Sequence, residues 1–273
     1  VIVVHLAGSP ADMDPILRMA KKRKIKVIED CAQSYLCWYK GRLAGTMGDI
    51  GCFSLNDFKH ISAGDAGMVL TNDDELAGRA QLFLDKGYAR DGSGRRPPFL
   101  APNYRPSELH AAVAIAQLRK LPGIVAQRNR LGDRLTDAIK DIPGVYPHKV
   151  LPGCKSSYWF YMGRMDPKRL KISRDDFVKA VSAEGVPVSG GYIGKMVYEY
   201  PVLMEHRAFE NCSYPWDGVY GRKVEYGPGL CPIAETIEAT SWRAPINENM
   251  TDKDVDDIAE AIRKVACWHG RKS

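Results

Sequence analysis

One lysine stands out in this sequence because of the residues around it. Lys59 is the single lysine between Gly48 and Thr71, a stretch rich in small, hydroxyl and glycine residues. Apolar runs at 50–55 and 68–71 predict short buried strands on either side of it. Burial disfavours an ammonium group, so a lysine held there has a lowered pKa and a nucleophilic amine, as a Schiff-base lysine needs. The alternative is a surface lysine on a loop between strands.

A carboxylate upstream strengthens the first interpretation. The apolar run at 27–28 ends in Glu29 and Asp30, and Asp30 precedes Lys59 by 29 residues (59 − 30). An acid at the carboxyl end of a parallel strand points into the crevice where open α/β sheets bind ligands. Glu29 points the opposite way, because side chains alternate along a strand. A lysine that forms an imine and a carboxylate that keeps a pyridine nitrogen protonated are the minimal pair for pyridoxal phosphate chemistry.

The elements that would position this pair follow from the hydrophobic pattern. Residues 1–4 and 26–29 read as strands, and 10–22 as an amphipathic helix between them. Strand, helix and strand at this spacing predict a parallel βαβ unit, hence an α/β fold. Asp73 and its neighbours predict the start of a helix that runs through Leu82. Residues 87–98, rich in Gly, Arg and Pro, read as an exposed loop.

The second half of the chain predicts a different arrangement. A helix is expected at 107–121, a break at Pro122 and Gly123, and a further helix from about 124 to 142. Beyond it, strands are expected at 158–165 and 186–189. Helices are expected at 173–185, with Ser173 as the cap, and at 251–265, with Val255, Ile258 and Ile262 in its apolar stripe. Together these elements make an α+β domain. We therefore predict a cofactor-binding large domain over 1–122, a connecting helix over 123–142 and a small C-terminal domain over 143–273.

Composition excludes several classes of protein. The 273 residues carry a net charge of +6, and their densest basic run, at 21–24, sits at a predicted helix end without interleaved aromatic residues. This pattern argues against nucleic-acid binding, and the lack of a long apolar run argues against a membrane span. Seven irregularly spaced cysteines argue against a disulfide framework and a zinc site, and favour a reducing, cytoplasmic compartment. We expect no metal.

Several stretches together resemble one family, the DegT/DnrJ/StrS sugar aminotransferases, which use pyridoxal 5'-phosphate and have the aspartate aminotransferase fold. The resemblance is carried by VHLAGSPADMDPILRMAKKRKIKVIEDCAQ, GDIGCFSLNDFKHISAGDAGMVLTNDDELAGRA, GYARDG, NYRPSELHAAVAIAQLRKLP and LCPIAETIEATSWRAPINENMTDKDVDDIAEAIRKV. It covers nearly the whole chain. It implies a three-layer, fold type I large domain that is incomplete at its N-terminus, with a smaller α+β C-terminal domain.

The resemblance also implies roles for individual residues. Lys59 would form the Schiff base with the cofactor and move the proton between substrate carbon and cofactor carbon. Asp30 would hold the pyridinium nitrogen, Gln33 would contact the ring oxygen and Ser54 would bind the phosphate. Simpler alternatives remain open: a solvated strand-end acid for Asp30, a polar loop residue for Gln33 and a hydroxyl bonded to backbone for Ser54.

Residues further along are implied less directly. Asn103 matches a residue that relatives donate across a dimer interface to the neighbouring phosphate, which implies a homodimer with shared active sites; an Asx-turn is the alternative. Arg105 could bind phosphate or substrate, and Tyr192 is a candidate substrate contact. Many relatives carry a histidine just before that tyrosine, where this chain has Gly191. The stretch 64–67, GDAG, also departs from the usual GEGG.

These residues predict a transaminase. A dehydratase branch of the family carries histidine at the position of Lys59, whereas here the histidine is the next residue, His60. The expected reaction transfers an amino group from glutamate or glutamine to a keto sugar, nucleotide-linked. The alternatives are an inosose-type cyclitol substrate, or a non-catalytic partner protein that keeps the fold.

Overall fold

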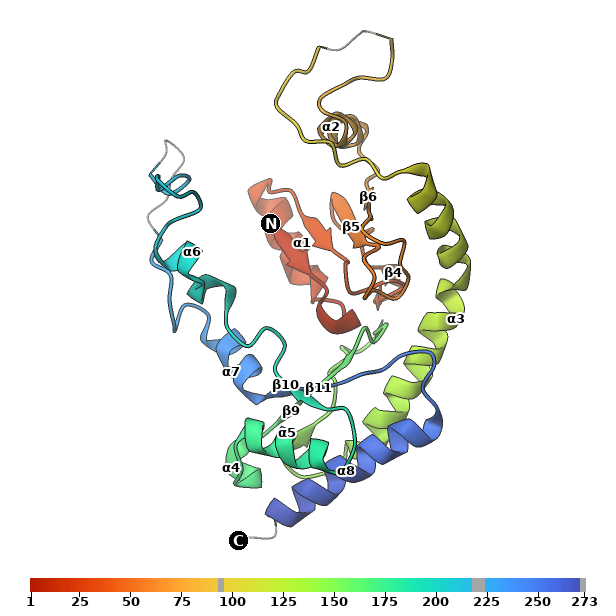
Figure 1. Ribbon diagram of the computed structural model, residues 1–273, viewed down its shortest axis with the longest axis vertical. Helices are drawn as coiled ribbons and strands as arrows, with labels where there is room; N and C mark the ends of the chain where they lie inside the picture. Colours follow the sequence, from red (N-terminus) through yellow and green to blue (C-terminus); the bar gives the residue numbers. More distant parts are fainter. Residues whose placement is uncertain (93–95, 218–223, 271–273) are drawn as a thin grey trace. The chain divides into compact units, whose positions relative to one another are not determined.

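The computed structural model describes residues 1–92, 96–217 and 224–270. They form two compact units, and each is described by itself. The first unit contains residues 1–134, 149–161 and 245–252, and the second contains 135–148, 162–244 and the chain from 253 onward. Each unit is therefore assembled from three separate segments of the chain, whose places in the sequence can be followed by the colours of Figure 1.

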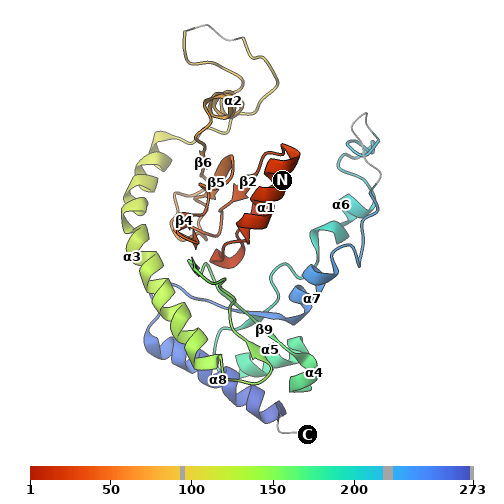
Figure 2. The same cartoon turned by 180° about the vertical axis from the view of Figure 1, so that it is seen from behind.

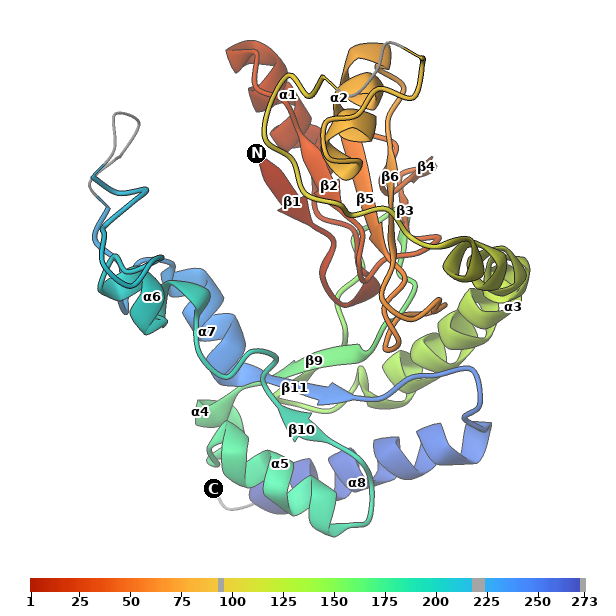
Figure 3. The ribbon, with the colours of Figure 1, turned by 45° about the horizontal axis from the view of Figure 1, so that its top comes forward.

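A four-stranded sheet forms the centre of the first unit. Its strands are ordered β1-β2-β5-β6 and lie side by side in Figure 3. β1, β2 and β5 are parallel, and β6 is antiparallel to β5. The bounds are β1 (Ile2–Val4), β2 (Ile28–Asp30), β5 (Ile50–Ser54) and β6 (Gly67–Leu70). Parallel strands joined through a helix confirm the predicted α/β arrangement.

The helix of this βαβ unit is α1 (Met13–Arg23), which begins three residues later than predicted. Met13 and Ala20 of α1 are buried in a core with Val3 and Val27. The predicted apolar stripe therefore does face the sheet, and removal of these side chains from water holds the helix in place.

The prediction that both strands flanking Lys59 are buried is wrong for β6. Met68, Val69 and Leu70 are 40%, 44% and 43% exposed. Among the described residues β6 is an edge strand, hydrogen-bonded to β5 alone. The sequence pattern reported apolar character correctly, but burial depends on which elements cover the strand, and that is a tertiary property.

Smaller elements complete the first unit. Asp73 caps α2 (Asp74–Leu84) by accepting hydrogen bonds from the amides of Glu75 and Leu76, as the sequence predicts. A second sheet has the order β4-β3-β8. The remaining bounds are η1 (Leu6–Gly8), β3 (Trp38–Tyr39), β4 (Arg42–Leu43) and β8 (Cys154–Lys155).

The helix break predicted at Pro122 and Gly123 is wrong. α3 (Glu108–Ile139) is one uninterrupted helix with Pro122 inside it, as Figure 2 also shows. Pro122 and Gly123 are exposed, whereas Leu121 and Val125 lie one turn apart in a buried core. Packing on either side of the proline outweighs the lost backbone hydrogen bond.

The predicted loop at 87–98 lies partly outside the described residues, at 93–95. Its described part is irregular.

The second unit contains a sheet of order β10-β11-β9-β7, in which β10 pairs antiparallel with β11 and β7 with β9. Ser173 caps α5 and Val255, Ile258 and Ile262 of α8 are buried, as predicted. The bounds are β7 (Val145–Tyr146), β9 (Tyr161–Met165), α4 (Pro167–Leu170), α5 (Arg174–Ala183), β10 (Ser189–Gly190), η2 (Val197–Glu199), α6 (Pro201–Met204), α7 (Pro232–Thr240), β11 (Ser241–Ala244) and α8 (Asp252–Gly270).

The predicted domain bounds of 1–122, 123–142 and 143–273 stay a prediction. The compact units follow contacts instead of chain order, so that segments 149–161 and 245–252 belong with the first unit. Within the described part of the chain, no helix combines the length and the apolar character needed to cross a bilayer.

Candidate active site

Lys59 lies in the loop that joins β5 to β6. Its amide donates to the carbonyl of Asn56 (3.1 Å). The amide of Asn56 in turn donates to Oγ of Ser54 (3.3 Å), and its side-chain Nδ2 donates to Oδ1 of Asp65 (2.9 Å). Leu55 and Ile61, on either side of the lysine, are buried against α3. The loop is thus held at both ends, and the short turn between them presents Lys59.

The amine of Lys59 is in a mixed environment. Burial lowers its pKa, and the negative charge of Asp30 opposes part of that shift. The Nζ atom lies 4.4 Å from the centre of the Trp159 ring. A half-buried lysine with a lowered pKa has a larger fraction of neutral, nucleophilic amine at neutral pH than a surface lysine. Lys59 is thus a half-buried lysine in a loop between strands, and its role in a Schiff base stays a prediction.

Asp30 is the last residue of β2, where it pairs with Cys52 of β5. Its Oδ1 accepts a hydrogen bond from the amide of Ala32 (3.0 Å). Its charge is near enough to act on the amine of Lys59. The parallel pairing of β2 and β5 brings together two residues that are 29 positions apart (59 − 30).

Gln33 and Ser54 make contacts within the protein. Gln33 is buried, and its Oε1 accepts from the amide of Ala7 (2.9 Å). Ser54 is half-buried at the end of β5; its carbonyl accepts from the Tyr35 hydroxyl (2.9 Å) and its Oγ accepts from Asn56. Both residues support the lysine loop or its surroundings, and their cofactor contacts stay a prediction.

Asn103 and Arg105 are exposed and lie beside a buried acid that the sequence did not single out. Nε of Arg105 lies 3.3 Å from Oδ1 of Asn103 and 3.0 Å from Oδ1 of Asp85. Arg90 and Lys86 also pair with Asp85, and these hydrogen bonds hold the pKa of its carboxyl well below the ordinary value. Asp85 therefore fixes the place of Arg105, although Asp85 itself only looks like the end of a helix in the sequence.

Tyr192 belongs to the second unit. Its amide donates to both carboxylate oxygens of Glu238 (3.0 and 2.9 Å), and the amide of Gly194 donates to Oε1 (2.9 Å). Gly191 has φ +58°, and a Cβ there would lie 2.1 Å from Oε1 of Glu238. A side chain at this position would therefore adopt a left-handed backbone conformation and displace the Glu238 carboxylate.

A buried polar cluster on the other side of β2 also went unpredicted. Glu29 is fully buried and Nε2 of His5 lies 2.9 Å from its Oε2. Nδ1 of His5 accepts from the amide of Ala11 (3.1 Å), so Nε2 carries the proton and donates to Glu29. The carboxylate also accepts from three backbone amides, those of Gly45, Met47 and Gly48.

The same cluster has the residue types of a metal site. Ligand atoms of His5, Glu29 and Cys31 lie within 4.8 Å of one another. Hydrogen bonds already occupy both histidine nitrogens and the carboxylate, and burial raises the pKa of the Cys31 thiol to about 12, so it stays protonated. The cluster is a hydrogen-bond network around a buried carboxylate.

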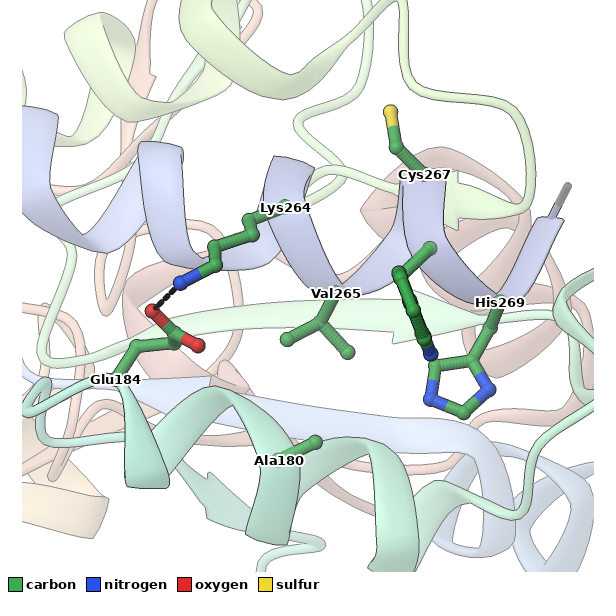
Figure 4. A pocket seen from close by; sticks show the side chains of 7 residues that line it. Ala180, Glu184, Lys264, Val265, Cys267 and His269 are labelled. Carbon is green, nitrogen blue, oxygen red and sulfur yellow. Dashed lines mark hydrogen bonds and ion pairs between the residues drawn. The ribbon is translucent and has the colours of Figure 1, made fainter.

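A pocket in the second unit lies between α5 and α8, and Figure 4 shows it from close by. Glu184 and Lys264 form an ion pair across its edge (2.5 Å). None of the predicted site residues lines this pocket. A pocket of the first unit does include one of them, Arg105, together with Asp85, Tyr88 and Arg90.

The fold is of fold type I, the class to which solved pyridoxal-phosphate-dependent aminotransferases belong. Residues 1–263 match the DegT/DnrJ/EryC1/StrS aminotransferase family, and the chain belongs to it. The resemblance expected from the sequence is thereby confirmed.

Individual relatives are enzymes of sugar and cyclitol metabolism. The chain is 34% identical over 280 residues to the GDP-perosamine synthase of Caulobacter vibrioides, with 97% of this chain and 65% of the relative covered. It is 28% identical over 273 residues to a proposed L-glutamine:3-amino-2,3-dideoxy-scyllo-inosose aminotransferase of Micromonospora echinospora, with 97% and 64% covered. A DegT DnrJ EryC1 StrS aminotransferase from Brucella abortus has a similar structure (TM-score 0.78, 25% identity, 99% and 64% covered). The chain thus spans less than two thirds of the length of these relatives.

Proposed function

We propose that this chain acts as a pyridoxal-phosphate-dependent aminotransferase that moves an amino group from glutamate or glutamine to a nucleotide-linked keto sugar. The observation that carries the proposal is that Asp30, at the end of β2, lies near enough for its charge to act on the amine of Lys59, whose pKa burial lowers. Family membership supplies the reaction class. The similarity to GDP-perosamine synthase favours a nucleotide-linked sugar.

The residues to which we assign cofactor binding in one subunit belong to the first unit. When bound, pyridoxal 5'-phosphate offers an aldehyde to an amine and a cationic ring that withdraws electrons from the reacting carbon. In our proposal, Nζ of Lys59 would be the nucleophile toward that aldehyde and the base for the proton at the substrate carbon. Asp30 would hold the proton on the ring nitrogen, and the Ser54 hydroxyl would hold the phosphate.

The remaining contacts are proposed for the assembled protein. Gln33 would contact the cofactor's ring oxygen, and Asn103 would reach the phosphate of the neighbouring subunit in a homodimer with shared active sites. Arg105 and Tyr192 would contact the substrate. Two observations support the assembly and its location: Leu109 and Val113 of α3 are exposed, as apolar side chains in a subunit interface would be, and all seven cysteines are free, as in the cytoplasm.

Covalent trapping tests the assignment of Lys59. The chain is incubated with pyridoxal 5'-phosphate and reduced with borohydride, and peptides are analysed by mass spectrometry. We expect the cofactor to be fixed on Lys59 and not on Lys59→Arg, while Lys26→Arg, at an exposed lysine, traps it as the wild type does. Trapping at another lysine, or equal trapping by Lys59→Arg, would refute the assignment.

A half-reaction tests the transaminase activity. Glutamate or glutamine should change the absorbance of the bound cofactor in the wild type. Asp30→Asn should keep the trapping on Lys59 but lose most of the half-reaction, because a neutral side chain no longer holds the ring proton. A wild-type chain that traps the cofactor and responds to neither amino donor would be the non-catalytic protein of the alternative hypothesis.

A cyclitol ketone is the second candidate substrate. Its support is the 28% identity, over 97% of this chain, to the proposed scyllo-inosose aminotransferase. Once loaded with an amino group, the protein is offered a nucleotide-linked keto sugar or a scyllo-inosose. The ketone that restores the original absorbance spectrum identifies the substrate class.

A further inference from the structure

A tryptophan far away in the sequence contacts the lysine loop twice. Nε1 of Trp159 donates a hydrogen bond to the carbonyl of Phe58 (2.7 Å), the residue immediately before Lys59. The face of the same ring lies against Nζ of Lys59, 4.4 Å from the ring centre. All three residues belong to the first unit. One side chain therefore contacts both the backbone that presents the lysine and the amine at its end.

The backbone of Trp159 is fixed from two sides. Its amide donates to the carbonyl of Ala7 (3.2 Å), and its carbonyl accepts from Nη1 of Arg128 (3.3 Å). Arg128 is itself held by an ion pair with Glu248 (2.8 Å). Oε1 of Gln33 accepts from the amide of Ala7 (2.9 Å), so the support of Trp159 reaches back to Gln33.

The segment before Trp159 is held equally firmly. The amide of Ser157 donates to the carbonyl of Gly8 (2.8 Å), and Nε2 of His60 donates to the carbonyl of Ser157 (2.9 Å). Gly8 has φ +87°, and a Cβ on it would lie 2.6 Å from the amide nitrogen of Tyr158. The two chain segments approach so closely that only glycine fits between them.

We propose that Trp159 is a positioning residue for Lys59, whose indole N–H fixes the peptide before the lysine and whose ring face holds the amine at one place. The proposal rests on the proposed function, in which Lys59 must meet the cofactor's aldehyde. A lysine side chain has many rotamers, and a cation over an aromatic face is attracted by the ring quadrupole, most strongly by tryptophan. The amine of Lys59 would thus occupy one defined position instead of sampling many rotamers in solvent.

The Trp159 ring and burial shift the pKa of Lys59 in opposite directions. Burial lowers the pKa of Lys59, whereas a ring face that stabilises the ammonium raises it. Among the described residues, the charged group that acts on the pKa of Lys59 is Asp30, and the adjacent His60 is neutral because burial lowers its pKa to about 3. A leucine at position 159 would keep an apolar side chain beside the amine and remove the attraction.

The test measures the amine of Lys59 without any cofactor. The full chain is labelled with trace acetic anhydride over a range of pH, and the Lys59 peptide is quantified against that of the exposed Lys120. For Trp159→Leu we expect the pKa of Lys59 to fall further, so that labelling at neutral pH rises about two- to five-fold. Trp159→Phe keeps a ring but loses the indole N–H, and should lie between Leu and the wild type.

A variant at the residue before Lys59 serves as the control. Phe58→Leu changes an exposed side chain, 79% accessible, but keeps the carbonyl that Trp159 binds, and should leave Lys59 labelling unchanged. A merely space-filling tryptophan would give the reverse result, a higher pKa of Lys59 in Trp159→Leu, because water would reach the amine. That result, or an unchanged pKa in both Trp159→Leu and Trp159→Phe, would overturn the proposal. Borohydride trapping at Lys59 is independent of this readout, so failure of the proposed function and failure of the positioning role can be told apart.

Discussion

His60, next to Lys59, should make the stability of the first unit depend on pH. The side chain is 3% exposed, and its Nε2 donates to the carbonyl of Ser157 (2.9 Å). No described residue is bonded to its Nδ1. Burial, together with the positive charge of Arg128, lowers the pKa of His60 from 6.5 to about 3. Protonation would therefore place a second positive charge in a dry site beside Arg128.

The size of the effect follows from this difference in pKa. Between about pH 6.5 and pH 3 the unfolded chain binds a proton at His60 that the folded chain does not, so the free energy of unfolding falls as the pH falls. The loss begins near the unfolded pKa and amounts to about 2 kcal/mol near pH 5, at 1.36 kcal/mol per unit below it. The buried neutral histidine thus makes the fold less stable in acid than at neutral pH.

Urea unfolding near pH 7 and near pH 5, followed by tryptophan fluorescence, measures this dependence. His60→Leu should be less stable near pH 7, because the Ser157 carbonyl loses its donor, but should lose about 2 kcal/mol less between the two pH values than the wild type. Ile61→Val, a conservative change at the buried neighbour, should lower stability and keep the wild-type pH dependence. His148 is also buried, with a pKa of about 4, and contributes equally to both proteins. An identical pH dependence in wild type and His60→Leu would refute the reasoning.

Two further predictions concern residues outside the proposed chemistry. Glu29→Gln should lower the free energy of unfolding by about 3 kcal/mol, because an amide cannot accept all the hydrogen bonds that the buried carboxylate receives from His5 and three backbone amides. Chemical denaturation measures this free energy, and a loss under about 1 kcal/mol would contradict the proposed hydrogen-bond network. Gly191→Ala should destabilise the second unit, because the new side chain would displace Glu238 from the amides of Tyr192 and Gly194. Hydrogen exchange at these two amides should then be faster than in the wild type. Amides that stay protected in the variant would show that the loop tolerates a side chain.

Local sequence patterns predicted the elements that depend on neighbouring residues. The apolar spacing of α1, the Asp73 cap of α2 and the Ser173 cap of α5 are all present as expected. Each of these signals acts within about one helical turn, so no knowledge of the rest of the fold is needed to read it. The helix break predicted at Pro122 is the exception among these local signals. α3 continues through the proline because Leu121 and Val125 are buried on either side of it.

Residues whose roles depend on distant partners were not found in the same way. Trp159 contacts the lysine loop from a segment 100 positions later (159 − 59), and nothing in its own neighbourhood marks it. Asp85 becomes a buried anchor only because Lys86, Arg90 and Arg105 converge on it. His60 looked like the neighbour of a catalytic residue, and the fold made it a buried donor to Ser157.

The sequence by itself determined the chemistry that is available: a lysine in a loop between two apolar strands, an acid at the end of the preceding parallel strand, and motifs that identify the family. These are properties of residue type and spacing, which the chain carries whether folded or not. The tertiary structure alone decided how the lysine is held, which strands are covered and which polar groups are buried. Those outcomes depend on which segments meet in space and exclude water from one another, and short-range patterns contain no record of that.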